Sequence, residues 1–132
     1  MANEAICYET PTRFRRYTVA NGTTIPKGTI LALSSPNTAA ACSGDNDVCG
    51  GIAYFEKLIN DGSTEITAAL DGTWGMLTTA AGITIGEDVG INGANEIKKY
   101  TTLDNEKGFV LGKALETIGA AATVIKVAVN VM

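Results

Sequence analysis

The stretch that decides the fold is Gly51-Ile52-Ala53, which is followed after a short gap by Thr64-Glu65-Ile66-Thr67-Ala68. The same pattern returns near the C-terminus, where Gly112-Lys113-Ala114 precedes Thr123-Val124-Ile125-Lys126-Val127. Each copy is typical of a strand opened by glycine, a loop, and a second strand whose side chains alternate between two faces. The repetition predicts a small all-β scaffold built from repeated hairpin units.

Turn-forming dipeptides divide the rest of the chain into short apolar runs. Asn21-Gly22 and Asn92-Gly93 favour type I′ hairpins, and Asp61-Gly62 and Asp71-Gly72 are similar turn signals. The runs between them predict strands at Arg16–Ala20, Thr29–Leu33, Ile52–Leu58, Thr64–Leu70, Thr73–Thr78, Asp88–Ile91, Ile97–Thr101, Phe109–Glu116 and Thr123–Val131. Many short strands at this spacing favour a single-domain barrel or sandwich. At most one short helix is expected, at Thr79-Ala80-Ala81.

The domain organisation that we expect is simple. Residues 1–17 have a weak pattern and are predicted to form an N-terminal arm, which precedes a β-domain at 18–132. Met1 to Tyr17 contains charges and no apolar core, so no signal peptide is expected, and no apolar run approaches the ~20 residues that cross a membrane.

Composition narrows the classes of partner and of chemistry. The net charge of -4 argues against nucleic acid, because phosphate contacts need clustered Lys and Arg. The chain contains no histidine, which removes Ser-His-Asp and Cys-His catalysis and the commonest zinc ligand. We therefore expect no enzyme activity, no metal and no cofactor.

Two local patterns leave alternatives open. Cys7, Cys42 and Cys49 make an odd number, which fits an intracellular origin with thiols, while a Cys42–Cys49 bridge remains an alternative. The acidic stretch from Asp45 to Glu56 resembles a calcium-loop spacing, but it has cysteine at the fifth position of the loop. Because the flanking segments do not predict helices, a polar hairpin tip is the favoured interpretation.

The candidate partner-binding residues combine charge with large apolar side chains. The one basic cluster consists of Arg13, Phe14, Arg15, Arg16 and Tyr17, and we expect it to dock on an acidic protein surface. A solvated strand edge that resists aggregation explains the same cluster about as well. The candidate surface is completed by Asn60, Asp61 and Trp74, although a lone tryptophan is more often a core residue.

Six motifs follow one another between Thr18 and Val131, and they are Thr24–Ile30, Gly51–Ala53, Ile66–Trp74, Gly82–Val89, Leu111–Leu115 and the last strand. Their order resembles the small capsid decoration (cement) proteins of tailed bacteriophages. In that family a KGT strand, a GIA strand, a hairpin ending in dG, an aGd turn, a vGkAl strand and a final valine-rich strand follow one another. The cysteine-containing segment at Cys42–Cys49 is not part of the family's pattern.

This resemblance implies a compact β-barrel or β-tulip subunit without catalytic residues. It implies a homotrimer on the exterior of the virion capsid, made in the host cytoplasm, that clamps neighbouring major capsid protein subunits and stabilises the lattice. Another virion β-module, such as a tail or fibre component or an adhesin-like domain, is the alternative.

Overall fold

The computed structural model describes residues 4–43, 48–79, 82–93, 95–100, 110–119 and 122–131. Every regular element within these ranges is a β-strand, which confirms the predicted all-β class. The described residues contain no helix of the length and apolar character that crossing a membrane requires. The short helix expected at 79–81 falls largely outside the described residues, since 80 and 81 are not among them.

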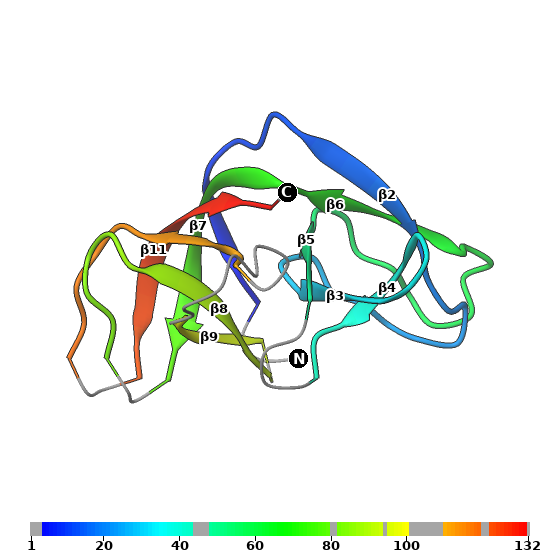
Figure 1. Cartoon of the computed structure of the whole chain (residues 1–132). Coiled ribbons are helices and arrows are strands. Elements are labelled where there is room, and N and C mark those ends of the chain that lie inside the picture. The colour runs from blue at the N-terminus through cyan, green and yellow to red at the C-terminus, as the bar shows by residue number, and fades with distance from the viewer. Residues whose placement is uncertain are drawn as a thin grey trace.

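The strands form two closed barrels that lie side by side (Figure 1). The first barrel has the hydrogen-bonded order β2-β4-β3-β5-β6. Its strands are β2 (Phe14–Thr18), β3 (Ile30–Ser35), β4 (Thr38–Ala41), β5 (Cys49–Ala53) and β6 (Glu65–Ala69). The second barrel has the order β7-β11-β10-β8-β9 and closes by pairing β7 with β9. Its strands are β7 (Asp71–Thr78), β8 (Asp88–Gly93), β9 (Glu96–Lys99), β10 (Gly112–Ala114) and β11 (Val124–Asn130), and β1 (Ile6–Glu9) pairs with β7.

The two barrels are built on the same plan. The parallel pairing of β2 with β4 has its counterpart in β7 with β9, and the other pairings are antiparallel in both barrels. The registers correspond as well, because Leu31 faces Ala41 in the first barrel where Val89 faces Lys99 in the second. The echo in the sequence coincides with β5–β6 and β10–β11. The repeated unit is therefore a whole five-stranded barrel rather than a hairpin.

Glycine occupies equivalent positions in β5 and β10 because the neighbouring strand lies too close for a side chain. A Cβ on Gly51, whose φ is +120°, would lie 2.7 Å from the carbonyl oxygen of Ala69. A Cβ on Gly112 would lie 2.3 Å from the carbonyl oxygen of Ala128. These contacts explain why the two copies in the sequence both carry glycine at this point.

The cores of the two barrels are filled mainly by aliphatic side chains. The interior of the first barrel is formed by Tyr17, Val19, Ile25, Leu31, Ala39, Ala53, Ile66 and Ala68. A larger cluster fills the second barrel and extends to Ile30 and Ile52, which alternate with these interior residues and so lie on the outside of the first barrel. Because burial of apolar surface is the main stabilising force, this shared cluster joins the barrels into one compact domain.

Hydrogen bonds reinforce the junction between the barrels. Strand β6 leads through Leu70 directly into β7, so one extended segment belongs to both barrels (Figure 1). Asn95, in the turn between β8 and β9, is 1% exposed. Its Oδ1 accepts the N–H of Ile30 at 2.6 Å, and its Nδ2 donates to the carbonyl oxygen of Gly28 at 3.1 Å. A side chain of the second barrel thus satisfies backbone groups of the first.

The described part of the predicted N-terminal arm is built into the two sheets. Residues 6–9 form β1, which pairs with β7, and residues 14–18 form β2, which pairs with β6. The Ala5 N–H also donates to the carbonyl oxygen of Gly28 at 2.8 Å. These backbone hydrogen bonds correct the expectation of a separate arm at 1–17, since an isolated arm would leave those groups to solvent.

Several local predictions need correction. The Asn21-Gly22 and Asn92-Gly93 turns are not type I′, because neither asparagine has a positive φ. Asp71-Gly72 is part of β7 rather than a turn, and β4 and β1 were not predicted. Cys42 and Cys49 do not form the disulfide bridge that the sequence left as an alternative. Both are thiols, and both side chains are buried.

Candidate functional site

Strand β2 carries the predicted basic cluster, and its side chains alternate between the inside and the outside of the first barrel. Tyr17 points inward and is 3% exposed, whereas Phe14 is 46% exposed. Arg15 shares the face of Tyr17 and donates to its hydroxyl at 3.5 Å. Phe14 and Arg16 therefore lie on the outer face of the barrel, where a partner can reach them.

Phe14 belongs to a row of aromatic rings on this outer face. Its ring centroid lies 5.1 Å from that of Tyr54, which in turn lies 5.2 Å from Phe55, both in edge-to-face arrangements. The Lys27 Nζ lies 5.1 Å from the Tyr54 ring centroid, within cation–π range. Phe55 is 61% exposed. Rings of this size, left in solvent beside a cation, are typical of a surface that contacts another protein.

Trp74 supports this row from beneath and does not reach the surface. It is fully buried, its ring centroid lies 6.5 Å from that of Tyr54, and its indole N–H donates to the carbonyl oxygen of Asp71 at 3.1 Å. The predicted contact role of Trp74 is therefore wrong, because the ring is already enclosed at the junction of the barrels. Tyr17 is likewise a core residue rather than a contact.

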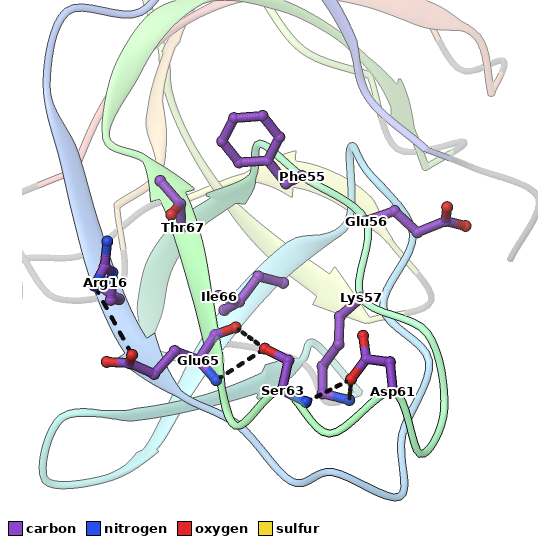
Figure 2. A pocket seen from close by; sticks show the side chains of 9 residues that line it. All are labelled: Arg16, Phe55, Glu56, Lys57, Asp61, Ser63, Glu65, Ile66 and Thr67. Atoms are coloured by element: carbon purple, nitrogen blue, oxygen red, sulfur yellow. Dashed lines mark hydrogen bonds and ion pairs between the residues drawn. The ribbon is translucent and has the colours of Figure 1, made fainter.

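A shallow hollow opens on the first barrel beside the aromatic row (Figure 2). It has a volume of about 310 Å³ and is lined by Arg16, Phe55, Glu56, Lys57, Asp61, Ser63, Glu65, Ile66 and Thr67. The Arg16 guanidinium lies 3.8 Å from the Glu65 carboxylate, with both side chains more than half exposed. Exposed pairs of this kind contribute little to stability, so the Arg16 charge remains available to a partner. We call Phe14, Arg16, Tyr54, Phe55 and Glu65 the β2 face.

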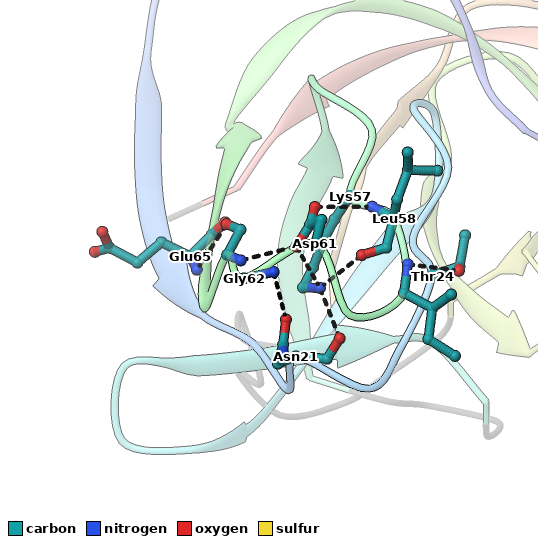
Figure 3. Close-up of polar contacts among 9 residues, drawn as sticks. Asn21, Thr24, Lys57, Leu58, Asp61, Gly62 and Glu65 are labelled. Atoms are coloured by element: carbon teal, nitrogen blue, oxygen red, sulfur yellow. Dashed lines mark hydrogen bonds and ion pairs between the residues drawn. The ribbon is translucent and has the colours of Figure 1, made fainter.

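A buried lysine organises the loop that contributes Lys57, Asp61 and Ser63 to the lining of the hollow, and Figure 3 shows its polar contacts. Lys57 is 2% exposed, and its Nζ donates to the carbonyl oxygens of Asn21 and Leu58, each at 3.0 Å. It also donates to Asp61 Oδ1 at 3.2 Å. An ammonium group has three donors, and these contacts use all of them. Lys57 therefore acts as a structural cross-link.

Asp61 closes the same loop, so it is a scaffold residue more than a contact. Its carboxylate accepts the backbone N–H groups of Ser63 at 2.8 Å and of Leu58 at 3.1 Å. The Ser63 hydrogen bond, with help from Lys57 and Leu58, lowers the pKa of Asp61 against the opposing effect of desolvation. The neighbouring Asn60 is exposed and has a φ of 54°, which places it at the tip of the loop.

Arg13 lies at the junction of the barrels and not on the β2 face. Its guanidinium donates to Asn130 Oδ1 at 2.8 Å and lies 3.5 Å from the Asp71 carboxylate. The Thr12 N–H and hydroxyl each donate to Asp71 at 2.7 Å. Desolvation would raise the pKa of Asp71, but the hydrogen bonds from Thr12 and Arg13 and the Arg13 charge outweigh it and lower that pKa. Arg13 thus fastens the start of β2 to the second barrel.

The structure brings together two of the predicted contact residues, Phe14 and Arg16, and adds three that the sequence reasoning missed. Tyr54 and Phe55 were assigned to a strand that was expected to run to Leu58. In fact β5 ends at Ala53. Two consecutive aromatic residues cannot both point into a barrel from one strand, and this signal in the sequence predicts that one of them is exposed. Glu65 was recognised as outward-facing but not as a neighbour of Arg16.

The comparisons with known proteins find a structural relative. The crystal structure of the N base of head fiber gp8.5 from bacteriophage phi29 has a similar fold, with a TM-score of 0.52. The match covers 89% of this chain and 93% of that chain at 11% sequence identity. At this identity the likeness shows a shared fold and transfers no residue's role. No family model matches the chain, and no curated protein is significantly similar in sequence.

Proposed function

We propose that this chain is a structural protein of a tailed-phage virion that binds the outer surface of the assembled head. In this role it contacts the major capsid protein and stabilises the capsid lattice as a decoration, or cement, protein. The role requires a rigid scaffold and a contact surface, and it involves no reaction and no cofactor.

The observation that carries the proposal is the shared fold. The likeness to the head fiber N base extends over nearly the whole of both chains, and that protein is part of a phage head. The resemblance of the motifs between Thr18 and Val131 to decoration proteins points to the same kind of particle from the sequence. A fold alone does not determine function, so the contact surface supplies the second support. The β2 face offers exposed rings and an arginine rather than a pocket of convergent catalytic groups.

Repeated copies would make modest contacts effective. The β2 face is small, and a surface of this size suits a weak contact. A homotrimer that engages several capsid subunits at once binds far more tightly than one copy, because the later contacts form at high effective concentration. Because such a ligand binds the assembled lattice and not separate subunits, it stabilises the lattice by mass action.

A second candidate is the base of a head fibre. The structural relative is described as the N base of a fiber, and this favours an anchoring module over the other tail or adhesin alternatives. The two candidates share the head as partner and differ in what the chain presents outward. A decoration protein would cover the head at many equivalent sites, whereas a fibre base would carry a projecting segment.

Co-sedimentation tests the proposal directly. Heads of the encoding phage are prepared without this chain and incubated with the purified protein, and unassembled major capsid protein serves as the control. We expect saturable binding to mature heads and little binding to free capsid protein. Failure to sediment with intact heads at micromolar concentration would contradict the proposal.

A further inference from the structure

A comparison of the two barrels shows that, among the described residues, the first barrel lacks an edge strand that the second barrel has. In the second barrel, the outer edge of β7 is paired with β1, with Ile6 opposite Gly75 and Glu9 opposite Thr73. The equivalent edge in the first barrel belongs to β2, because β2 pairs with β6 as β7 pairs with β11. Among the described residues, β2 has no strand at this edge except at Thr18, which faces Thr38 of β4.

The directions of the backbone hydrogen bonds identify which N–H and C=O groups of β2 point to its unpaired edge. The carbonyl oxygen of Arg13 accepts the Leu70 N–H, and the Val19 N–H donates to Thr64, so the odd-numbered residues of β2 face β6. The Thr18 N–H points the other way and donates to Asn37. Because backbone groups alternate along an antiparallel strand, the N–H and C=O groups of Phe14 and Arg16 point to the open edge. Their positions correspond to Thr73 and Gly75, which β1 covers.

This edge lies next to the β2 face. Phe14 and Arg16 are exposed, and β2 lies at the outline of the molecule in Figure 1. In the second barrel, β1 presents Tyr8 over Gly75, with the Lys126 Nζ 5.0 Å from its ring centroid. A strand added to β2 would place a side chain in the corresponding position, against Arg16. That side chain therefore meets a guanidinium, which favours a carboxylate or an aromatic ring.

Charge argues against a second copy of this chain as the added strand. If β2 paired with β2 of another copy about a two-fold axis near its centre, either Arg16 or Arg15 would lie opposite the same arginine of that copy, depending on the register. Like charges directly opposite one another destabilise a pair of strands. The same positive charge attracts an acidic segment, because the Arg16 side chain is 68% exposed beside the open edge and residues 14–18 contain no carboxylate.

We propose that the open edge of β2 accepts an extended acidic segment of a capsid protein, which adds antiparallel to β2 and occupies the position that β1 occupies on β7. This inference rests on the proposed function, because it names the surface and the mode by which the chain binds the head. Backbone hydrogen bonds at Phe14 and Arg16 supply affinity, and the arginines and the exposed rings select the segment.

Two variants at one position separate backbone pairing from charge. Arg16→Pro removes the N–H that points to the open edge and leaves the hydrogen bonds to β6 in place, and strands tolerate proline where the N–H side faces solvent. Arg16→Ala removes the same side chain and keeps the N–H. In the sedimentation assay with assembled heads, we expect Arg16→Ala to weaken binding by less than about fivefold. Arg16→Pro should weaken it at least about tenfold, because the strand can no longer pair.

Hydrogen exchange on the unmodified chain gives a second readout that does not depend on the folding of a variant. The amide protons of Phe14 and Arg16 should exchange rapidly in the purified protein and become protected when it is bound to heads. Equal binding by the two variants, or unchanged exchange at both amides in the bound chain, would overturn the inference and leave the proposed function standing. Absence of binding by the unmodified chain would instead refute the proposed function itself.

Discussion

At the scale of single residues, Lys57 shows how the two barrels differ at equivalent positions of a common plan. Lys57 forms a bridge with Ile25, and the equivalent bridge in the second barrel joins Ile83 with Ile118. The first barrel thus buries an ammonium group where the second has an aliphatic side chain. The ammonium satisfies two carbonyl oxygens and Asp61, which allows the longer loop of the first barrel to fold against it.

Lys57→Met tests this role, because it keeps the length of the side chain and removes its three donors. We expect the free energy of unfolding to fall by about 2–3 kcal/mol, since buried acceptors are left without partners. Chemical denaturation followed by tryptophan fluorescence measures the change. Lys113→Met, at an exposed position on β10, is the matched control and should change stability by less than ~0.5 kcal/mol. Equal effects of the two substitutions would contradict the role.

Asp71 makes the junction sensitive to acid. Its pKa is lowered in the folded protein from an ordinary value of 3.8. A lowered pKa means that the stabilisation is present above the ordinary value and is lost as the pH falls through the folded-state pKa. Asp71→Asn should therefore reduce stability by ~1 kcal/mol at pH 7, after allowance for solvent screening, and by much less near pH 2. Denaturation curves at the two pH values measure this, and a pH-independent difference would contradict it.

Residue types alone predicted part of the candidate site. Phe14 and Arg16 were recognised because a basic and aromatic cluster stands out in an acidic chain. Trp74 was assigned to a contact because its burial depends on the packing of one barrel against the other, which no local pattern reports. Tyr54 and Phe55 were missed for the converse reason, since β5 ends before them and turns both rings toward the outer face.

At the scale of elements, the glycines of β5 and β10 set how closely neighbouring strands approach. Gly112→Ala would place a Cβ 2.3 Å from the carbonyl oxygen of Ala128, so the strands must move apart. We expect a loss of at least about 2 kcal/mol in the free energy of unfolding. The control is Gly119→Ala, where a Cβ would meet nothing within 4 Å. A thermal-melting comparison that shows equal shifts would refute the steric explanation.

Most strands were predictable because the alternation of apolar side chains in the sequence persists in the structure, most clearly in β6 and β11. The short strand β4 was missed because its sequence, Thr38-Ala39-Ala40-Ala41, has no alternation. Strand β1 was missed because its side chains at Ile6 and Tyr8 stay exposed, and its place is determined by backbone pairing with β7. The closure of each barrel depends on the parallel pairings, which join strands distant in the sequence.

At the scale of the whole molecule, the barrels should unfold together, because one apolar cluster and the Asn95 side chain join them. Asn95 has a positive φ of 61°, which glycine also adopts without strain. Asn95→Gly therefore removes only the side-chain amide, which bonds to the N–H of Ile30 and the carbonyl oxygen of Gly28. We expect a loss of about 2 kcal/mol with a single unfolding transition. Asn37→Gly, at the equivalent exposed turn of the first barrel, should be close to neutral. A loss at Asn37 equal to that at Asn95 would contradict the inter-barrel role.

The most direct test of the account is an image of the native phage particle at a resolution that separates subunits. The account predicts that the tandem barrel fits density on the exterior of the head, with the edge of β2 toward the capsid protein. Density for this chain on the tail alone, or a head whose outer surface carries none of it, would contradict the central claim.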